Sequence, residues 1–216
     1  QQISLLISLL SLYPFGSSKE HRNNTLLLWV KIIIASVPAG ILGILFKDTI
    51  EAKLRGPIII AAALIIYGFL FILIERQDKT PSVKKLGEIT YLQALLIGAF
   101  QVLSLIPGTS RSGSTIVGAL FIGLSRPIAA EFSFMMSIPV MLGAGAISIL
   151  KADVALTGIE IAVLAVGFIT AFVVSLFVMK ALMNFVRKHK FTPFAYYRIA
   201  LGLVILALLS FQILKV

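Results

Sequence analysis

The chain has no cysteine, only two histidines and few charged residues. Without cysteine it can form neither disulfides nor thiolate sites. His21 and His189, both in polar connections, are too few for a histidine-rich metal site. Only 13% of the residues are charged and 59% are hydrophobic, well above the roughly 45–50% usual for soluble domains. This composition excludes an ordinary soluble domain and predicts an integral membrane protein.

Five apolar runs come close to the roughly 20 residues that an α-helix needs to cross a membrane. They lie at about 25–46, 57–74, 127–150, 158–182 and 194–214. Residues 1–13 are apolar but too short, so we expect them to be the second half of a span whose first half precedes Gln1. The sequence therefore predicts one all-α transmembrane domain over residues 1–216.

The net charge of +10 would suggest nucleic-acid binding in a soluble chain, but here the basic residues lie mostly between apolar runs. One side of the predicted bundle collects Lys19, Arg22, Arg76, Lys79, Lys84, Lys85, Arg126, Arg187, Lys188 and Lys190. The other side has Lys47, Lys53, Arg55, Lys151 and Lys215. The first side is predicted to be cytoplasmic. Lys31, Lys180 and Arg198 lie near it and are expected to reach it with their long side chains, which leaves only Arg111 without an interface.

Residues 89–124 differ from the five spans, because two apolar arms flank a polar centre. At 1.5 Å per residue the arms 92–106 and 114–124 cover about 22 Å and about 16 Å, both short of a hydrocarbon core about 30 Å thick. We therefore predict a re-entrant helical hairpin whose tip is buried in protein or lines a wet cavity. The runs 37–69 and 166–206 also resemble each other and start on opposite sides, as inverted-topology repeats would.

The predicted hairpin tip, "IPGTSRSGST" over 106–115, carries an arginine into the membrane. An intramembrane arginine is costly and indicates function, although an ion pair or a bond to a carbonyl could also hold it. Hydroxyls, glycine backbone N–H groups and a helix N-terminus together make a phosphate cradle, and the planar fork of arginine suits two phosphate oxygens. The residues of this cradle are Gly108, Thr109, Ser110, Arg111, Ser112, Gly113, Ser114 and Thr115. As the simpler alternative, Ser112 or Ser114 caps the helix.

The stretch "LQALLIGAFQVLSLIPGTSRSGSTIVGALFIGLSRPIAAEFSFMMSIPVMLGA", with "VGFITAFVV" and "FTPFAYYRI" later, resembles the second conserved region of undecaprenyl-diphosphatases, the bacterial bacitracin-resistance family. The resemblance implies hydrolysis of undecaprenyl diphosphate, a polyprenyl diphosphate lipid, to undecaprenyl phosphate and inorganic phosphate in the bacterial plasma membrane. It also implies that Arg111 clamps the diphosphate while Ser110, Ser112 and Thr115 donate hydrogen bonds to it. We take Arg111, Ser110 and Ser112 as candidate catalytic residues and the remaining cradle residues as substrate-binding.

The family also has an earlier region, with paired glutamates and a loop containing histidine, that has no counterpart in this sequence. By the resemblance, that region would supply the ligands of a divalent cation (Mg or Ca) and the nucleophile or base, so no metal ligand is expected in this chain. Gln101 stands where the first glutamate would be, and could bind substrate or form an interhelical amide bond. Glu131 could pair with Arg111 or interact with its own helix dipole, and we include it among the substrate-binding candidates.

Two other functions stay open on the sequence alone. Repeats, broken helices and a midplane anion site are also features of transporters and lipid flippases. The other alternative is a non-catalytic fragment that binds lipid phosphate. The sequence is also compatible with a homodimer.

Overall fold

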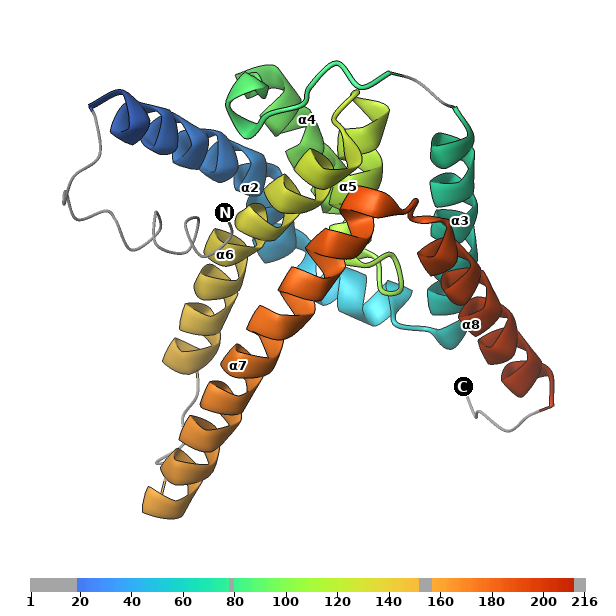
Figure 1. The fold of residues 1–216 in the computed structure, drawn as a ribbon. Coiled ribbons are helices and arrows are strands. Elements are labelled where there is room, and N and C mark those ends of the chain that lie inside the picture. Colours follow the sequence, from blue (N-terminus) through green and yellow to red (C-terminus); the bar gives the residue numbers. More distant parts are fainter. Residues whose placement is uncertain (1–18, 78–79, 152–156, 212–216) are drawn as a thin grey trace.

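The computed structural model describes residues 19–77, 80–151 and 157–211, and within these ranges the chain is helical with no strand. Its helices are α2 (Lys19–Leu54), α3 (Pro57–Arg76), η1 (Leu86–Glu88), α4 (Tyr91–Val102), η2 (Leu103–Leu105), α5 (Arg111–Phe121), α6 (Arg126–Lys151), α7 (Gly158–Lys188) and α8 (Thr192–Ser210), shown in Figure 1. The half-span expected over residues 1–13 lies outside the described residues.

Five of these helices are long and apolar enough to cross a membrane. The membrane-crossing segments are Asn24–Phe46, Pro57–Arg76, Arg126–Leu150, Gly158–Lys188 and Thr192–Ser210, and they overlap the five apolar runs of the sequence. Large apolar side chains cover the outer faces of these helices, as expected where the solvent is lipid. The protein is therefore an all-α integral membrane protein with several spans.

Residues 89–124 form a hairpin of two short helices, α4 and α5, joined by η2 and the loop 106–110. The two helices pack closely, since a Cβ added at Gly118 on α5 would lie 2.4 Å from the Phe100 ring on α4. Neither helix is long enough to cross the membrane, as the sequence predicts. The hairpin is held among α2, α3 and α6 in the middle of the bundle, which places its loop inside protein (Figure 1).

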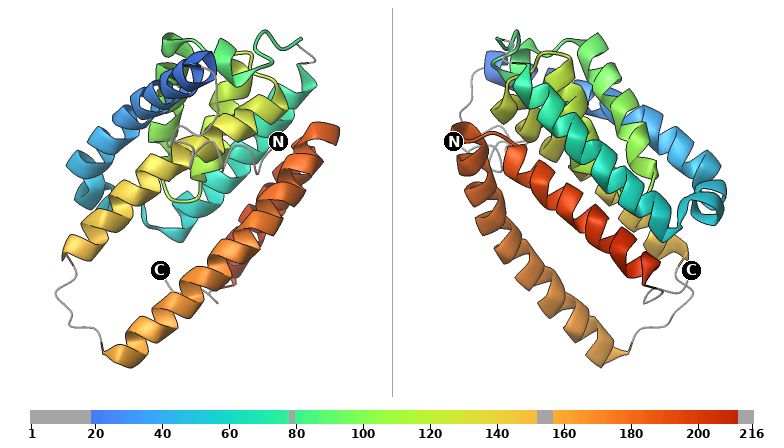
Figure 2. Two further views of the ribbon diagram at one scale, coloured as in Figure 1. Left: turned by 60° about the vertical axis from the view of Figure 1, so that its left-hand side comes forward. Right: turned by 90° about the vertical axis from the view of Figure 1, so that its right-hand side faces the viewer.

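Small residues bring two pairs of helices into close contact. The helices α3 and α8 lie side by side in the right-hand view of Figure 2, and a Cβ at Gly68 or Gly202 would come within 3.0 Å of the facing helix. The helices α2 and α4 meet at Gly98, where a Cβ would lie 2.2 Å from the Ala35 carbonyl oxygen. By contrast, α7 leans away from the rest and buries only Met183 and Val186 among the described residues (Figure 2).

Lys31 on α2, which we expect from the sequence to reach toward the cytoplasmic interface, contacts the connection between α3 and α4. Lys31 is buried along its stem and donates from Nζ to the Gly87 carbonyl oxygen at 3.2 Å, with the Tyr91 ring 5.7 Å away. Glu88 on the same short turn is exposed and accepts from the backbone N–H groups of Lys84 and Lys85. These bonds hold the pKa of its carboxyl below the usual value, with the bond from Lys84 as the largest cause.

Candidate functional site

The hairpin loop turns sharply against α3, and its backbone requires a glycine. Gly108 has φ +95°, and a Cβ there would lie 2.6 Å from the Ile60 carbonyl oxygen. Both the left-handed backbone and the close approach to α3 exclude other residues at this position. The loop is therefore packed directly onto a membrane-spanning helix.

Ser110 is the N-cap of α5, which corrects the expectation that Ser112 or Ser114 would cap this helix. Its Oγ accepts from the Gly113 N–H at 3.3 Å and lies 3.4 Å from the Ser112 Oγ. Ser110 is also the only non-glycine with positive φ, +66°, in the described part of the chain. Strained residues of this kind are often found where function requires a particular geometry. The two hydroxyls of Ser110 and Ser112 thus stand together at the N-terminus of α5.

The other three hydroxyls of the motif point into the protein. Thr109 is 2% exposed and its Oγ1 contacts the carbonyl oxygens of Leu103 and Ile106 at 3.0 and 2.8 Å. Ser114 is fully buried and donates to the Ser110 carbonyl oxygen at 3.2 Å. In this arrangement both side chains stabilise the turn, because a hydroxyl has only one hydrogen to donate.

Thr115 joins the hairpin to α6. Its Oγ1 lies 2.6 Å from the Ser133 Oγ, and both side chains are buried. The same oxygen is 3.1 Å from the Arg111 carbonyl oxygen. Thr115 therefore fixes the rotation of α5 relative to α6, and with it the direction in which Arg111 points.

Arg111 is half-buried and turns toward α6, where its Nη1 donates to the Ser137 carbonyl oxygen at 3.3 Å. No ion pair joins it to Glu131, which is half-buried and lies six residues before Ser137 on α6. Among the described residues, Arg111 thus has a neutral acceptor and no permanent counter-ion. An arginine in this state can exchange its carbonyl acceptor for an anion.

A second arginine reaches the loop, and the sequence reasoning missed it. Arg198 on α8 was expected to extend to the cytoplasmic interface. Instead, its Nη2 donates to the carbonyl oxygens of Gly108 and Thr109 at 2.7 and 2.8 Å. Its guanidinium also lies 5.7 Å from the Tyr67 ring centre. Only the close packing of α3 and α8, which the sequence does not reveal, makes this contact reachable.

Some of these groups line a cavity of about 240 Å³ that is polar at one end and apolar along its walls, whereas Arg111, Thr109, Ser114 and Thr115 are not among its lining residues. Ser110, Ser112, Gly113 and Arg198 form the polar part. The walls come from five helices and the connection before α8, and all are aromatic or aliphatic, namely Phe71, Ile116, Ala130, Phe134, Leu182, Val186, Phe191, Phe194 and Tyr197. A ligand with an anionic head and a hydrocarbon tail matches both parts.

Gln101 does not line this cavity. It lies on the buried face of α4, together with Gly98. It is 1% exposed and its Nε2 has no hydrogen-bond partner in the described residues. The expected interhelical amide bond from this nitrogen is therefore not made here. A buried donor without a partner is unfavourable and marks Gln101 as a position to test.

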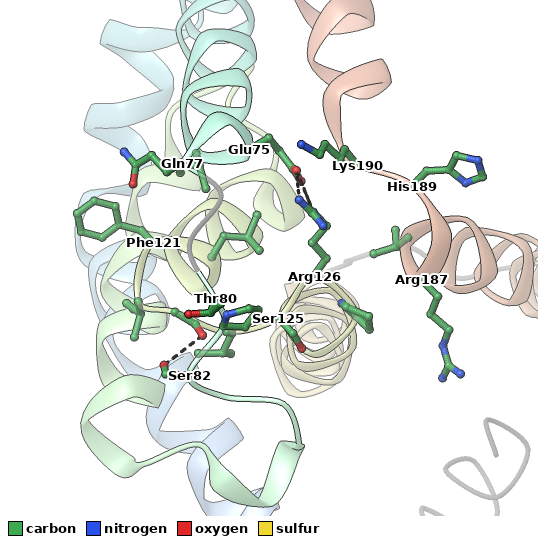
Figure 3. A pocket seen from close by; sticks show the side chains of 18 of the residues that line it. Glu75, Gln77, Thr80, Ser82, Phe121, Ser125, Arg126, Arg187, His189 and Lys190 are labelled. Atoms are coloured by element: carbon green, nitrogen blue, oxygen red, sulfur yellow. Dashed lines mark hydrogen bonds and ion pairs between the residues drawn. The ribbon is translucent and has the colours of Figure 1, made fainter.

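A larger cavity of about 770 Å³ lies at the basic ends of the helices (Figure 3). Its one carboxylate, Glu75, is bound to Arg126, and Arg187 and His189 point away from that pair in Figure 3. The basic groups therefore do not converge on a common point. We place the candidate chemistry in the smaller cavity, where Ser110, Ser112, Gly113 and Arg198 meet.

No group of three or more histidine, aspartate or glutamate side chains in the described ranges could hold a metal ion. The residues described here thus do not make a site for a divalent cation, and no chemical step below is assigned to one. The cation that the resemblance implies stays a prediction.

Comparison with known proteins gives consistent relatives. The family model of the bacitracin resistance protein BacA matches residues 5–204. Undecaprenyl-diphosphatase 1 of Clostridioides difficile strain 630 is 50% identical over 205 residues, which cover 94% of this chain and 75% of that protein. An undecaprenyl-diphosphatase of Enterococcus faecalis is 50% identical over 201 residues, covering 90% of this chain and 73% of the relative. One from Acetivibrio thermocellus is 46% identical with the same coverage.

Proposed function

We propose that this protein, which belongs to the bacitracin resistance protein BacA family, hydrolyses undecaprenyl diphosphate to undecaprenyl phosphate and inorganic phosphate. Relatives that are about half identical over most of the chain are named for this activity. The five apolar helices and the bacterial relatives support a reaction in the bacterial plasma membrane. The product is the lipid carrier that cell-wall synthesis uses again.

The shape and polarity of the 240 Å³ cavity beside α5, called the hairpin cavity below, support this proposal. The substrate has a diphosphate head and a long hydrocarbon tail, and the cavity has hydroxyls and a guanidinium at one end and aromatic walls along the rest. An N-terminal helix turn with unpaired N–H groups favours an anion at the same place. The head would lie at the start of α5 and the tail would leave between the helices into lipid.

In the reaction, water adds to the terminal phosphorus and the bond to the bridging oxygen breaks. That oxygen leaves with the lipid monophosphate, while the terminal phosphoryl group becomes inorganic phosphate. Negative charge shifts among the phosphoryl oxygens in the transition state, so donors held rigidly in an apolar site stabilise it. Ser110 and Ser112 donate from their hydroxyls, and Arg111 exchanges the Ser137 carbonyl oxygen for a phosphoryl oxygen.

The other candidates have supporting roles in this proposal. The backbones of Gly108 and Gly113 allow the loop and the helix N-terminus to approach the phosphate, and Thr109, Ser114 and Thr115 hold the loop in shape. Gln101 and Glu131 stay candidates for contact with the substrate. We assign no nucleophile or general base to a described residue. We also expect the basic loops to face the cytoplasmic membrane surface and not nucleic acid.

Phosphate release tests the function. The protein expressed from the full reading frame is purified in detergent and given a polyprenyl diphosphate, with and without a chelator followed by excess Mg²⁺ or Ca²⁺. Release of inorganic phosphate supports the proposal, and loss of release with the chelator supports the predicted cation. No release under any of these conditions, or lipid movement in vesicles without hydrolysis, would reject hydrolysis in favour of a transporter. The mass of the same detergent complex distinguishes a monomer from a homodimer.

A further inference from the structure

Arg198 has unused donors at the polar end of the hairpin cavity. An arginine carries five N–H groups, and here only Nη2 is bonded, to the two loop carbonyl oxygens. Its Nη1 is 3.3 Å from the position that a Cβ on Gly113 would occupy. Its Nε is sealed from solvent and has no hydrogen-bond partner in the described residues. The guanidinium is therefore next to the N-terminus of α5 with donors that no described group satisfies.

The surroundings of Arg198 favour an anion over any other ligand. The cavity lining holds no carboxylate, and the positive charge is offset only by the face of the Tyr67 ring and by backbone carbonyls. A positive charge removed from water is stabilised most by hydrogen bonds from its free N–H groups to a negatively charged acceptor. The neighbouring hydroxyls of Ser110 and Ser112, lining the same cavity, can donate to the same acceptor.

We propose that Arg198 is a second guanidinium of the diphosphate site, which binds a phosphoryl oxygen through Nη1 while Nη2 holds the Gly108–Thr109 backbone in place. This inference rests on the proposed function for the identity of the ligand. Arg111 is the first residue of α5 and its side chain turns toward α6, whereas Arg198 reaches the loop before α5 from α8, so the two guanidinium groups belong to different helices. A diphosphate carries charge on two phosphoryl groups, and two separate guanidinium groups can share it.

Three variants test this role in the full-length protein. Arg198→Gln removes the charge, Arg198→Lys keeps the charge without the fork, and Arg76→Gln removes an exposed arginine from the end of α3 as the control. The measurements are KM and kcat for a polyprenyl diphosphate, the inhibition constant of inorganic diphosphate, and that of the corresponding polyprenyl monophosphate. Stabilisation of the unreacted protein by inorganic diphosphate is measured by thermal unfolding in detergent.

For Arg198→Gln we expect KM and the diphosphate inhibition constant to rise roughly ten- to hundredfold, with a smaller rise for the monophosphate. Arg198→Lys should lie between this variant and the wild type, and Arg76→Gln should match the wild type. A residue that only braces the loop would lower kcat and would change the affinity for the two ligands equally. Equal changes, or an unchanged diphosphate inhibition constant, would overturn the proposal.

The thermal measurement separates this proposal from the proposed function. If the wild type releases no phosphate, hydrolysis fails, but stabilisation by inorganic diphosphate that is lost in Arg198→Gln still supports the anion site. If the wild type is not stabilised, or if Arg198→Gln is stabilised equally, the arginine does not bind diphosphate. If neither Arg198 variant folds while Arg76→Gln does, Arg198 acts only in holding the fold and the proposal is wrong.

Discussion

Arg126 at the start of α6 and Glu75 near the end of α3 form a bidentate ion pair. The Arg126 Nη2 lies 2.6 Å from one carboxylate oxygen, and its Nε lies within 2.9 Å of both (Figure 3). Glu75 is 3% exposed and also accepts from the Phe191 N–H at 3.2 Å. One carboxylate therefore joins α3, α6 and the connection between α7 and α8, and so closes the basic end of the bundle.

Replacing Glu75 tests how much this junction stabilises the protein. Glu75→Leu removes the carboxylate that Arg126 and the Phe191 N–H share, and should cost about 2 kcal/mol, less than for a fully buried pair because Arg126 is 37% exposed. Glu75→Gln can still accept from Phe191 and should lose less. The midpoint of thermal unfolding in detergent measures both, with Arg76→Gln as the neighbouring control. A midpoint for Glu75→Leu equal to that of the control would show that the pair contributes nothing.

Arg111→Lys keeps a positive charge at the hairpin and removes the planar fork. Since a lysine cannot contact two phosphate oxygens in one plane, we expect kcat/KM to fall roughly hundredfold or more, with normal insertion and stability. Phosphate release from a polyprenyl diphosphate measures the effect, and Arg76→Lys is the matched control at an exposed arginine. Turnover close to that of the wild type would contradict the clamp role of Arg111.

Two substitutions at Ser110 separate its backbone role from its hydroxyl. Glycine accepts the positive φ of +66°, whereas alanine keeps the strain, and both remove the cap to Gly113. Ser110→Ala should therefore be less stable than Ser110→Gly by about 1 kcal/mol. Both should lose activity to a similar extent, since both lack the donor. Full activity in Ser110→Gly would show that the side chain serves only as a helix cap.

Gly98→Ala tests the close contact that holds the hairpin against α2. The new Cβ would lie 2.2 Å from the Ala35 carbonyl oxygen, so the two helices must separate, at a cost of about 2 kcal/mol. Gly40→Ala on α2 is the control, because nothing lies within 4 Å of its Cβ and alanine favours a helix. Thermal unfolding should rank Gly98→Ala below the wild type and Gly40→Ala at or above it. The reverse order would mean that α4 is not seated as described.

The sequence alone was enough for the class of protein, the five spans, the short hairpin and the location of its polar tip. These features depend on composition and on the length of apolar runs, which are local properties of the chain. A run of residues too short to cross the membrane and interrupted by "PGTSRSG" has few other arrangements in lipid, because its backbone must be satisfied within protein.

The tertiary structure decided which polar groups face the cavity. The sequence placed all five hydroxyls in one phosphate cradle, but the loop turns Thr109 inward, the rotation of α5 buries Ser114 and Thr115, and only Ser110 and Ser112 line the cavity. Arg198 reaches a loop 90 residues away only because glycines let α8 lie close against α3. Such contacts depend on how distant helices pack and rotate, and the spacing of residues along one helix does not determine either.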